Sequence, residues 1–522
     1  MSSELQDVIT ALSDPRTYPH CPESVDIVQT HISVVFIAGD LVYKIKKPVN
    51  LGFLDFTSLE KRRHFCRQEV LLNSRFSEGI YLGVVAICQS ERGINLKGEG
   101  EPVEAAVLMR YIPEERTLRW MLEQDRVTKE MMDGLADRIA AIHGQAKTGA
   151  DIASFGSLEV ISLNLRENFT QTEPYIGRTL DEDVHRAIAQ RALDFVETRK
   201  GLFRGRAEQG FIRDCHGDLH ADHVVFVNGI VLVDCIEFND RFRYGDTASD
   251  LGFLLMDLDF HGYPAFSGQV ANRYAISAND PHVLELLGFY KSYRAFVRGK
   301  VLGFRLDEAE VSREDKESAR ETARLYFQLS LSYLAPPPPV LIIMMGFSGT
   351  GKSYIAARLG RRLGAELFRS DVVRKRIFGV PRGEHRLDKF GEGIYRRSAT
   401  KLTYAALFDE SRKALEHGRS VILDASFLRF EDRESARDVA RRAGARFRMI
   451  ECVASDEILR ERLEKRARDR EEVSDARWEI LQRQKAIIDP IRPEESQALR
   501  IWDSTENINS FLASFVRELL AT

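Results

Sequence analysis

The first 335 residues alternate hydrophobic and polar positions before the pattern becomes helical. Two alternating segments flank Ala38-Gly39-Asp40 and predict an antiparallel hairpin, because successive side chains of a strand point to opposite faces. From Leu118 onward the pattern is mainly helical. The expected elements are strands at 32–37, 41–45 and 104–111, a helix at 58–76 and a short β island at 224–233. A small β lobe followed by a helical lobe predicts an α+β, bilobal domain.

The rest of the chain alternates apolar segments with helical ones. Apolar runs at 340–345, 420–423 and 447–453 predict strands, and the helices between them predict an α/β domain with a parallel sheet. Four prolines at 336–339 form a stiff spacer that cannot continue a helix. We therefore expect one domain at 1–335, a linker at 336–339 and a second domain at 340–522.

Composition indicates a globular enzyme rather than a fibrous or membrane protein. The 522 residues are 44% hydrophobic and 30% charged, which excludes collagen, coiled coil and full disorder. No apolar run reaches the roughly 18 residues that cross a bilayer, and the N-terminus lacks a secretory signal pattern. The six cysteines include no Cys-x-x-Cys pair, which indicates isolated thiols in a reducing compartment. We expect a cytoplasmic protein that does not contact a membrane.

Charge is unevenly distributed along the chain. The total of 75 basic and 79 acidic residues gives a net charge of −4, but residues 340–522 hold 36 basic and 29 acidic residues. Of those basic residues 29 are arginine, whose planar fork matches phosphate oxygens. This favours an anionic substrate for the second domain; a solvated, salt-bridged helical surface is the alternative.

A complete phosphate-loop motif follows the strand at 340–345. Residues 346–353 match G-x-x-x-x-G-K-[ST], and a helical segment follows them. Backbone N–H groups of such a loop bind phosphates at a helix N-terminus. The candidates for this role are Gly346, Ser348, Gly349, Thr350 and Gly351. Lys352 would reach the β and γ phosphates, and the Ser353 hydroxyl would bind Mg²⁺.

Two carboxylates in the same domain are candidates for chemistry. Asp371 is expected after a short strand at 366–369, and Arg374 three residues later lies on the same helical face. Asp371 could accept the proton of an attacking hydroxyl while Arg374 holds a phosphate, or it could simply cap a helix. Asp424 ends an apolar strand, as a Mg²⁺-site carboxylate does, although a helix cap is again the alternative.

An arginine-rich helix is predicted at 459–470. Its alternating charges allow i,i+4 pairs, and the other interpretation is a lid whose arginines close on the transferring phosphoryl group. Together these elements make residues 340 to about 500 resemble polynucleotide kinase, zeta-toxin and gluconate-kinase domains. The resemblance implies Asp371 as general base, Arg374 as phosphate clamp, and Arg466 and Arg470 as lid arginines.

A second constellation lies in the first domain. Asp218 lies in the segment Cys215 to Val224, and Asp234 follows the β island. Phosphoryl transfer needs a carboxylate at the hydroxyl and oxygen ligands for Mg²⁺, and these two residues could supply both. The His/Asp cluster could also bind a metal, but it lacks the H-E-x-x-H spacing of a zinc site.

This region resembles the aminoglycoside phosphotransferase family, a branch of the protein-kinase-like fold. The matching residues are His216, Gly217, Asp218, Asp234, Gly245, Asp246 and Asp250. The resemblance implies Asp218 as catalytic residue, Asp234 as metal ligand and Asp250 as structural. It further implies that Lys44 contacts ATP and pairs with Glu69, and that Met109 to Tyr111 meet adenine. Lys46 shares a strand face with Lys44, so the lysine assignment could shift by two.

The chain departs from this family at two places. His223 stands where the family has a metal-binding Asn, so a softer nitrogen replaces a hard oxygen. Residues 30–33 stand where a glycine-rich loop would cover the phosphates. Asp222 or Glu237 could replace the Asn, the metal could differ, or the domain could have lost phosphoryl transfer.

The whole chain looks like bacterial fusions of these two kinds of domain, which implies a bifunctional kinase using ATP (or GTP) with Mg²⁺. The acceptor at the second domain could be a 5′-hydroxyl of RNA or DNA, a nucleotide or a small polyol. The alternative is a non-catalytic first domain that senses ATP or docks a substrate. A nucleotide-dependent switch and an antibiotic-resistance enzyme agree less well with Asp371 and with the attached phosphate-loop domain.

Overall fold

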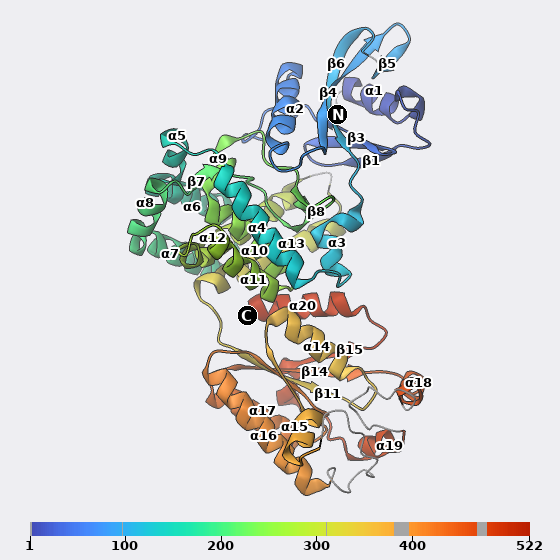
Figure 1. Ribbon diagram of the computed structural model, residues 1–522, viewed down its shortest axis with the longest axis vertical. Coiled ribbons are helices and arrows are strands. Elements are labelled where there is room, and N and C mark those ends of the chain that lie inside the picture. The colour runs from blue at the N-terminus through green and yellow to red at the C-terminus, as the bar shows by residue number, and fades with distance from the viewer. Residues whose placement is uncertain (1–2, 97, 309–310, 381–395, 467–477, 522) are drawn as a thin grey trace. The chain divides into compact units, whose positions relative to one another are not determined.

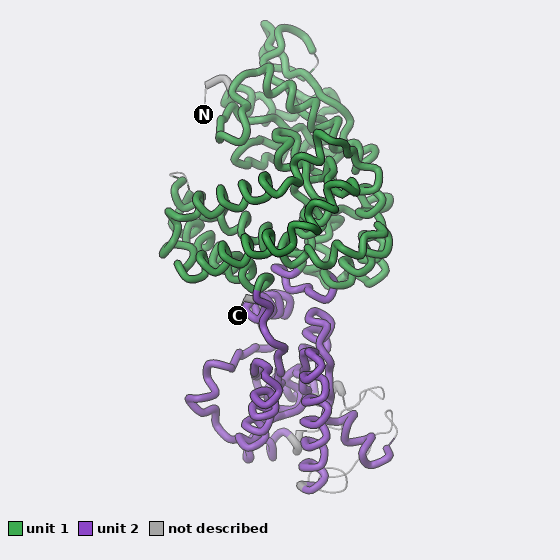
Figure 2. Tube along the Cα trace, turned by 90° about the vertical axis from the view of Figure 1, so that its left-hand side faces the viewer, with its two compact units in different colours: residues 1–258, 267–334 green, residues 259–266, 335–522 purple. Residues whose placement is uncertain are grey.

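The computed structural model describes residues 3–96, 98–308, 311–380, 396–466 and 478–521 (Figure 1). Two compact units make up the chain: residues 1–258 with 267–334, and residues 259–266 with 335–522 (Figure 2). Within the described ranges, no helix combines the length and apolar character that a membrane crossing needs. Each unit has its own sheet and its own core.

The first unit begins with a six-stranded antiparallel sheet of order β1-β2-β3-β6-β4-β5. Its strands are β1 (Asp26–Gln29), β2 (Ser33–Ala38), β3 (Leu41–Lys46), β4 (Tyr81–Ser90), β5 (Gly93–Asn95) and β6 (Glu101–Arg110). The predicted hairpin is β2–β3, with Ala38 paired to Leu41. The helix expected at 58–76 is α2 (Leu59–Asn73).

Alternation along β3 separates a core face from a face that carries the lysines. Tyr43 and Ile45 pack into a cluster with Leu5 and Val8 of α1 (Ser3–Leu12). Lys44 therefore points to the opposite face, toward α2, and so does Lys46. Figure 1 places α1 and α2 on either side of this sheet.

The second lobe of the first unit is helical and contains short two-stranded sheets. Its short strands are β7 (Ile212–Asp214), β8 (Val224–Phe226), β9 (Ile230–Leu232) and β10 (Tyr244–Asp246). Its helices are α3 (Leu118–Glu123), α4 (Lys129–Gln145), α5 (Ala150–Ala153), α6 (Leu158–Thr172), α7 (Glu182–Thr198), α8 (Lys200–Glu208), α9 (Asp240–Arg243), α10 (Thr247–Phe260), α11 (Pro264–Ser277), α12 (Val283–Phe304) and α13 (Arg313–Leu334). The loop between β7 and β8 carries Asp218, and α10 behind it is buried along its whole length.

The second unit is a parallel five-stranded sheet of order β12-β13-β11-β14-β15. Its strands are β11 (Val340–Met345), β12 (Glu366–Arg369), β13 (Val421–Asp424), β14 (Arg446–Val453) and β15 (Leu499–Asp503). Its helices are α14 (Lys352–Leu363), α15 (Ser370–Ile377), α16 (Arg397–Glu416), α17 (Phe430–Arg442), α18 (Asp456–Arg466), α19 (Trp478–Ile487) and α20 (Ile508–Ala521).

Helices cover both faces of this sheet, so its central strand is apolar throughout. Every residue of β11 is buried. Ile342 packs with residues of α14 and α20, whereas its neighbour Ile343 packs with residues of α16 and α17. A strand that is buried on both faces has hydrophobic residues at every position, as residues 340–345 do. The expected fold class, α+β followed by α/β, is confirmed.

Candidate active sites

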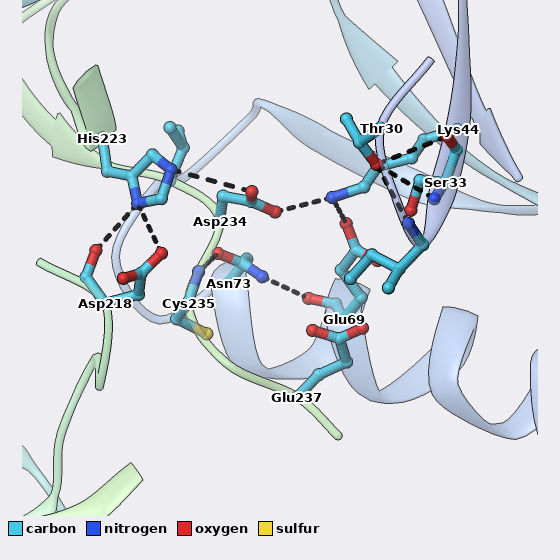
Figure 3. Close-up of polar contacts among 12 residues, drawn as sticks. Thr30, Ser33, Lys44, Glu69, Asn73, Asp218, His223, Asp234, Cys235 and Glu237 are labelled. Carbon is cyan, nitrogen blue, oxygen red and sulfur yellow. Dashed lines mark hydrogen bonds and ion pairs between the residues drawn. The ribbon is translucent and has the colours of Figure 1, made fainter. Parts of the chain in front are cut away.

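A buried ion-pair network joins β3 to α2 in the first unit (Figure 3). Lys44 Nζ lies 2.9 Å from Glu69 Oε1 and 2.6 Å from Asp234 Oδ1. Lys46 Nζ lies 2.7 Å from Glu69 Oε2 and also contacts Glu237. The expected Lys44–Glu69 pair is therefore present, and Lys46 shares the same carboxylate.

Exposure separates the roles of the two lysines. The Lys44 side chain is 17% exposed and contacts Asp234, whereas the Lys46 side chain is 1% exposed and lies between two glutamates. Burial would lower the pKa of Lys44, but the carboxylates of Asp234 and Glu69 raise it well above its usual range. For the carboxylate Glu237 the effect of burial has the opposite sign: burial raises its pKa, although the charge of Lys46 acts to lower it. Lys44 is thus the more exposed of the two lysines and the one that contacts Asp234.

The loop after β7 is held by Asp250 of α10. Asp250 accepts hydrogen bonds from the backbone N–H groups of His216 (3.1 Å) and Gly217 (2.8 Å), and it contacts His143 Nε2 at 3.1 Å. Gly217 has φ +85°, and a Cβ there would lie 2.8 Å from the carbonyl oxygen of Phe242. The carboxylate expected to be structural therefore orients the backbone beside Asp218, and glycine is required there.

Two histidines surround the Asp218 carboxylate. His220 Nε2 and His223 Nδ1 each lie 3.7 Å from Asp218 Oδ2, and His220 Nδ1 lies 3.5 Å from Asp222. Burial would lower the pKa of His220, but its contacts with Asp218 and Asp222 raise it to about 10. Burial would raise the pKa of Asp218, but His220 lowers it well below its usual range. Asp218 is thus an ionised carboxylate beside an imidazolium.

Asp234 approaches this cluster from a strained backbone. Its φ is +59°, in the left-handed region that residues other than glycine adopt at a cost. The conformation is supported by its N–H, which donates to the Tyr81 hydroxyl at 3.0 Å. One oxygen contacts Lys44 and the other lies 3.7 Å from His223 Nε2 (Figure 3). The chain fold therefore brings together Lys44, Asp218, His223 and Asp234, as the sequence predicts.

The remaining predicted nucleotide contacts of this unit, Met109 and Tyr111, lie at the end of β6, an inner strand of the sheet. Met109 of β6 pairs with Val42 of β3, and Tyr111 follows β6 with 42% of its surface exposed. Thr30 and Ser33 form the tight turn between β1 and β2, in which the Ser33 N–H donates to Thr30 Oγ1 at 3.0 Å (Figure 3).

The phosphate loop of the second unit runs from β11 into α14. A Cβ at Gly346 would lie 2.4 Å from the carbonyl oxygen of Cys452, so the loop cannot pass β14 with a larger residue. Gly349 and Gly351 also have positive φ. Lys352 Nζ donates to the Phe347 carbonyl at 2.6 Å, across the concave side of its own loop.

The two predicted carboxylates each contact an arginine. Arg374 Nη1 lies 2.7 Å from Asp371 Oδ1, so the expected pairing on one helical face is present. The cap position of α15 is Arg369, which excludes Asp371 as the N-cap. Asp424 is buried at the end of β13 and accepts from Arg369 Nε at 3.2 Å. It caps no helix, because α17 begins at Phe430.

Three further residues contact the phosphate loop, and of these only Arg462 lies in a segment that the sequence singled out, the arginine-rich helix predicted at 459–470. Gln484 of α19 accepts from the Ser348 N–H at 2.9 Å, and Arg462 of α18 donates to the Gly349 carbonyl at 3.3 Å. The Trp502 ring lies beside Gly351. The approach of Gln484 and Trp502 depends on tertiary packing, and no motif marks these two residues. The side chain of the predicted lid residue Arg466, and all of Arg470, lie outside the described residues.

The donors at the two sites fit Mg²⁺ differently. Ser353 offers a hydroxyl and Asp424 a carboxylate, which are the oxygen donors that Mg²⁺ prefers. Asp234 offers a carboxylate in the first unit, but His223 offers a ring nitrogen, which does not fit an all-oxygen magnesium site.

Comparison with known proteins gives one family-model match in each of the two units. A family model described as a phosphotransferase enzyme family matches residues 81–287, and one described as an AAA domain matches residues 341–491. Among solved structures, a gluconokinase from Sinorhizobium meliloti 1021 is 20% identical, with TM-score 0.25, covering 35% of this chain and 97% of that chain. The APS kinase CysC of Mycobacterium tuberculosis is 21% identical, with TM-score 0.26, covering 36% and 100%.

The folds and the family models together define a phosphotransferase with kinase-type domains, one of them a P-loop domain. An uncharacterized protein of Mycobacterium tuberculosis strain H37Rv is 31% identical over 446 residues, which is 85% of this chain and 86% of that protein. A protein of Mycobacterium bovis matches equally well. The chain belongs to the same family as these mycobacterial proteins, and the resemblance to the two kinds of kinase domain that was inferred from its motifs is confirmed.

Proposed function

We propose that the chain is a bifunctional ATP-dependent phosphotransferase with one nucleotide site in each unit. The observation that most supports two sites is the first unit's arrangement, in which Lys44 pairs with Glu69 and Asp234 while Asp218 lies on the far side of His223. This is the set of groups that phosphoryl transfer needs: a cation for phosphates, a metal-binding carboxylate and a carboxylate for the acceptor.

In the second unit, the proposed reaction moves the γ-phosphoryl group of ATP (or GTP) to a hydroxyl. Asp371 accepts the hydroxyl proton, the acceptor oxygen bonds to phosphorus, and the bond between the γ-phosphorus and the bridging oxygen breaks to leave ADP (or GDP). Lys352 and Arg374 balance the phosphate charge. Mg²⁺ held by Ser353 and Asp424 would neutralise the β and γ oxygens.

The proposed acceptor at this site carries a hydroxyl and is anionic: a 5′-hydroxyl end of RNA or DNA, a nucleotide or a small phosphorylated polyol. The excess of arginine in residues 340–522 supports this class, because guanidinium groups pair with phosphate oxygens in two places. The first unit would phosphorylate a second small molecule through Asp218.

The test is transfer of labelled γ-phosphate from ATP to a panel of acceptors by the full chain. The panel contains 5′-hydroxyl RNA and DNA, nucleosides, sugars and an aminoglycoside. Asp371→Asn should lower transfer at the second unit at least 100-fold while ATP still binds, because only the proton acceptor is removed. The control is Asp409→Asn, an exposed carboxylate on α16 that pairs with Arg412 and Lys413. Undiminished transfer by Asp371→Asn contradicts the mechanism.

Transfer that survives Lys352→Ala would come from the first unit, and Asp218→Asn should then remove it. The control is Asp194→Asn, an exposed carboxylate on α7 that accepts hydrogen bonds from Gln190. A specific observation favours a second candidate function, in which the first unit only senses ATP: His223 replaces an amide oxygen at the metal position. In that case Asp218→Asn alters the rate at the second unit, and no acceptor is labelled once Lys352 is removed.

A further inference from the structure

His223 has one nitrogen occupied and one available. Its Nδ1 lies 2.8 Å from the backbone carbonyl oxygen of Asp218. A carbonyl can only accept a hydrogen bond, so Nδ1 carries the proton. In the neutral ring, Nε2 then holds a lone pair, which is the form in which imidazole binds metals.

This available nitrogen faces a carboxylate across a gap that neither a hydrogen bond nor a direct contact fills. His223 Nε2 lies 3.7 Å from Asp234 Oδ2. Hydrogen bonds between nitrogen and oxygen span about 2.7–3.2 Å, so a shared proton does not explain the approach. Two ligands on one tetrahedral metal, with bonds of about 2.1 Å, lie about 3.4 Å apart. The gap is close to that separation.

The surrounding groups fix the two donors and leave room on the open side. The Asp218 carbonyl orients the His223 ring, and Lys44 and Tyr81 hold Asp234 in place. Such outer contacts are what hold metal ligands in position. The His223 side chain is 15% exposed and that of Asp234 is 45% exposed. Water or phosphate oxygens can therefore complete the coordination.

A metal on the other side of the ring is excluded by the same tautomer. Ligand atoms of Asp218, His220 and His223 lie within 4.8 Å of one another, which would suit a metal by distance alone. On that side, however, His223 presents an N–H rather than a lone pair, and His220 is already in contact with Asp218 and Asp222.

We propose that the first unit binds a first-row transition-metal ion between His223 Nε2 and Asp234 Oδ2, in place of an all-oxygen Mg²⁺ site. A ring nitrogen strengthens binding of the ions from Mn²⁺ to Zn²⁺, whereas Mg²⁺ gains little from it. The inference rests on the proposed nucleotide site of this unit, but metal binding is measured without nucleotide or acceptor. Metal binding and phosphoryl transfer can therefore fail independently.

The experiment titrates the full chain with Mn²⁺ alone and follows binding by electron paramagnetic resonance. Pulsed measurements then detect a directly bonded nitrogen through its modulation of the Mn²⁺ signal. The wild type should bind Mn²⁺ with nitrogen modulation and retain it in excess Mg²⁺. His223→Asn should remove the modulation and weaken Mn²⁺ binding about tenfold or more, while Mg²⁺ competes better.

The matched control is His220→Asn, which removes the neighbouring ring but keeps both proposed ligands. It should retain the nitrogen modulation. Mn²⁺ binding without nitrogen modulation in the wild type overturns the proposal, and so does a failure to bind Mn²⁺. If the modulation is lost in His220→Asn but survives in His223→Asn, the metal ligand is His220 and the proposal is wrong. The wild-type result stands even if a variant does not fold.

Discussion

The different surroundings of Lys44 and Lys46 lead to a prediction about which lysine serves the fold and which serves the nucleotide. Replacing Lys46 by Met leaves Glu69 and Glu237 buried without one of their cations. Removing one partner of a buried ion pair costs about 3–5 kcal/mol. Replacing Lys44 leaves Glu69 paired with Lys46, and Asp234 is partly solvated, so about 1–2 kcal/mol is expected.

These free energies convert to measurable shifts in the melting temperature of the first unit. About 330 residues belong to that unit, and at roughly 2.1 cal/mol/K per residue the unfolding entropy is about 0.7 kcal/mol/K. Lys46→Met should therefore lower Tm by about 4–7 °C, and Lys44→Met by about 1–3 °C. Lys47→Met serves as control, because the Lys47 side chain is at the surface, where Nζ donates an exposed hydrogen bond to the Thr30 carbonyl oxygen.

Scanning calorimetry of the full chain measures the shift, and ATP binding to the first unit is measured in chains that also carry Lys352→Ala. Lys44→Met should lose ATP binding while remaining folded. The reasoning is refuted if Lys46→Met has the same melting temperature as the Lys47→Met control. It is also refuted if Lys46→Met stays stable but loses ATP while Lys44→Met still binds it.

Gly346→Ala should abolish nucleotide binding by the second unit without unfolding the first, since its Cβ would lie 2.4 Å from the Cys452 carbonyl oxygen; equilibrium ATP binding in a chain that also carries Lys44→Met checks this. Gly217→Ala should abolish transfer by the first unit, whereas Gly229→Ala, also at positive φ but in open space, should not. Burial would raise the pKa of Asp250, but a hydrogen bond from a buried histidine lowers it to about 2. The stability it contributes should therefore be complete above about pH 4 and be lost toward pH 2, so urea unfolding should separate wild type from Asp250→Asn at pH 5 more than at pH 2.5.

Much of the site could be predicted because its signals are local. The phosphate loop needs glycines, a lysine and a serine in consecutive positions, between a strand and a helix. Lys44 lies two residues from Lys46 on one strand, and alternation alone indicates that both face the same way. Asp371 and Arg374 are one helical turn apart, so their contact follows from helix geometry.

Other features depend on residues that are distant in sequence. Lys44 contacts Asp234 across 190 positions, and Lys46 contacts Glu237 across 191. No periodicity shows which of the two lysines is enclosed, because that depends on where the segment after β9 places Asp234 and Glu237. Gln484 contacts Ser348 across 136 positions. Ser348 belongs to the phosphate-loop motif, but Gln484 does not, so no motif links the two residues.

Local sequence patterns were enough to predict the two kinds of fold, the phosphate loop and most of the polar residues that make up the two candidate sites. These follow from short-range sterics, alternation and helical spacing, which act within a few residues. Three features became visible in the folded chain alone: Glu69 pairs with two lysines, Asp234 adopts a left-handed backbone, and His223 turns Nε2 toward Asp234. Those outcomes depend on long-range packing, which sets the distances between groups that no local pattern relates.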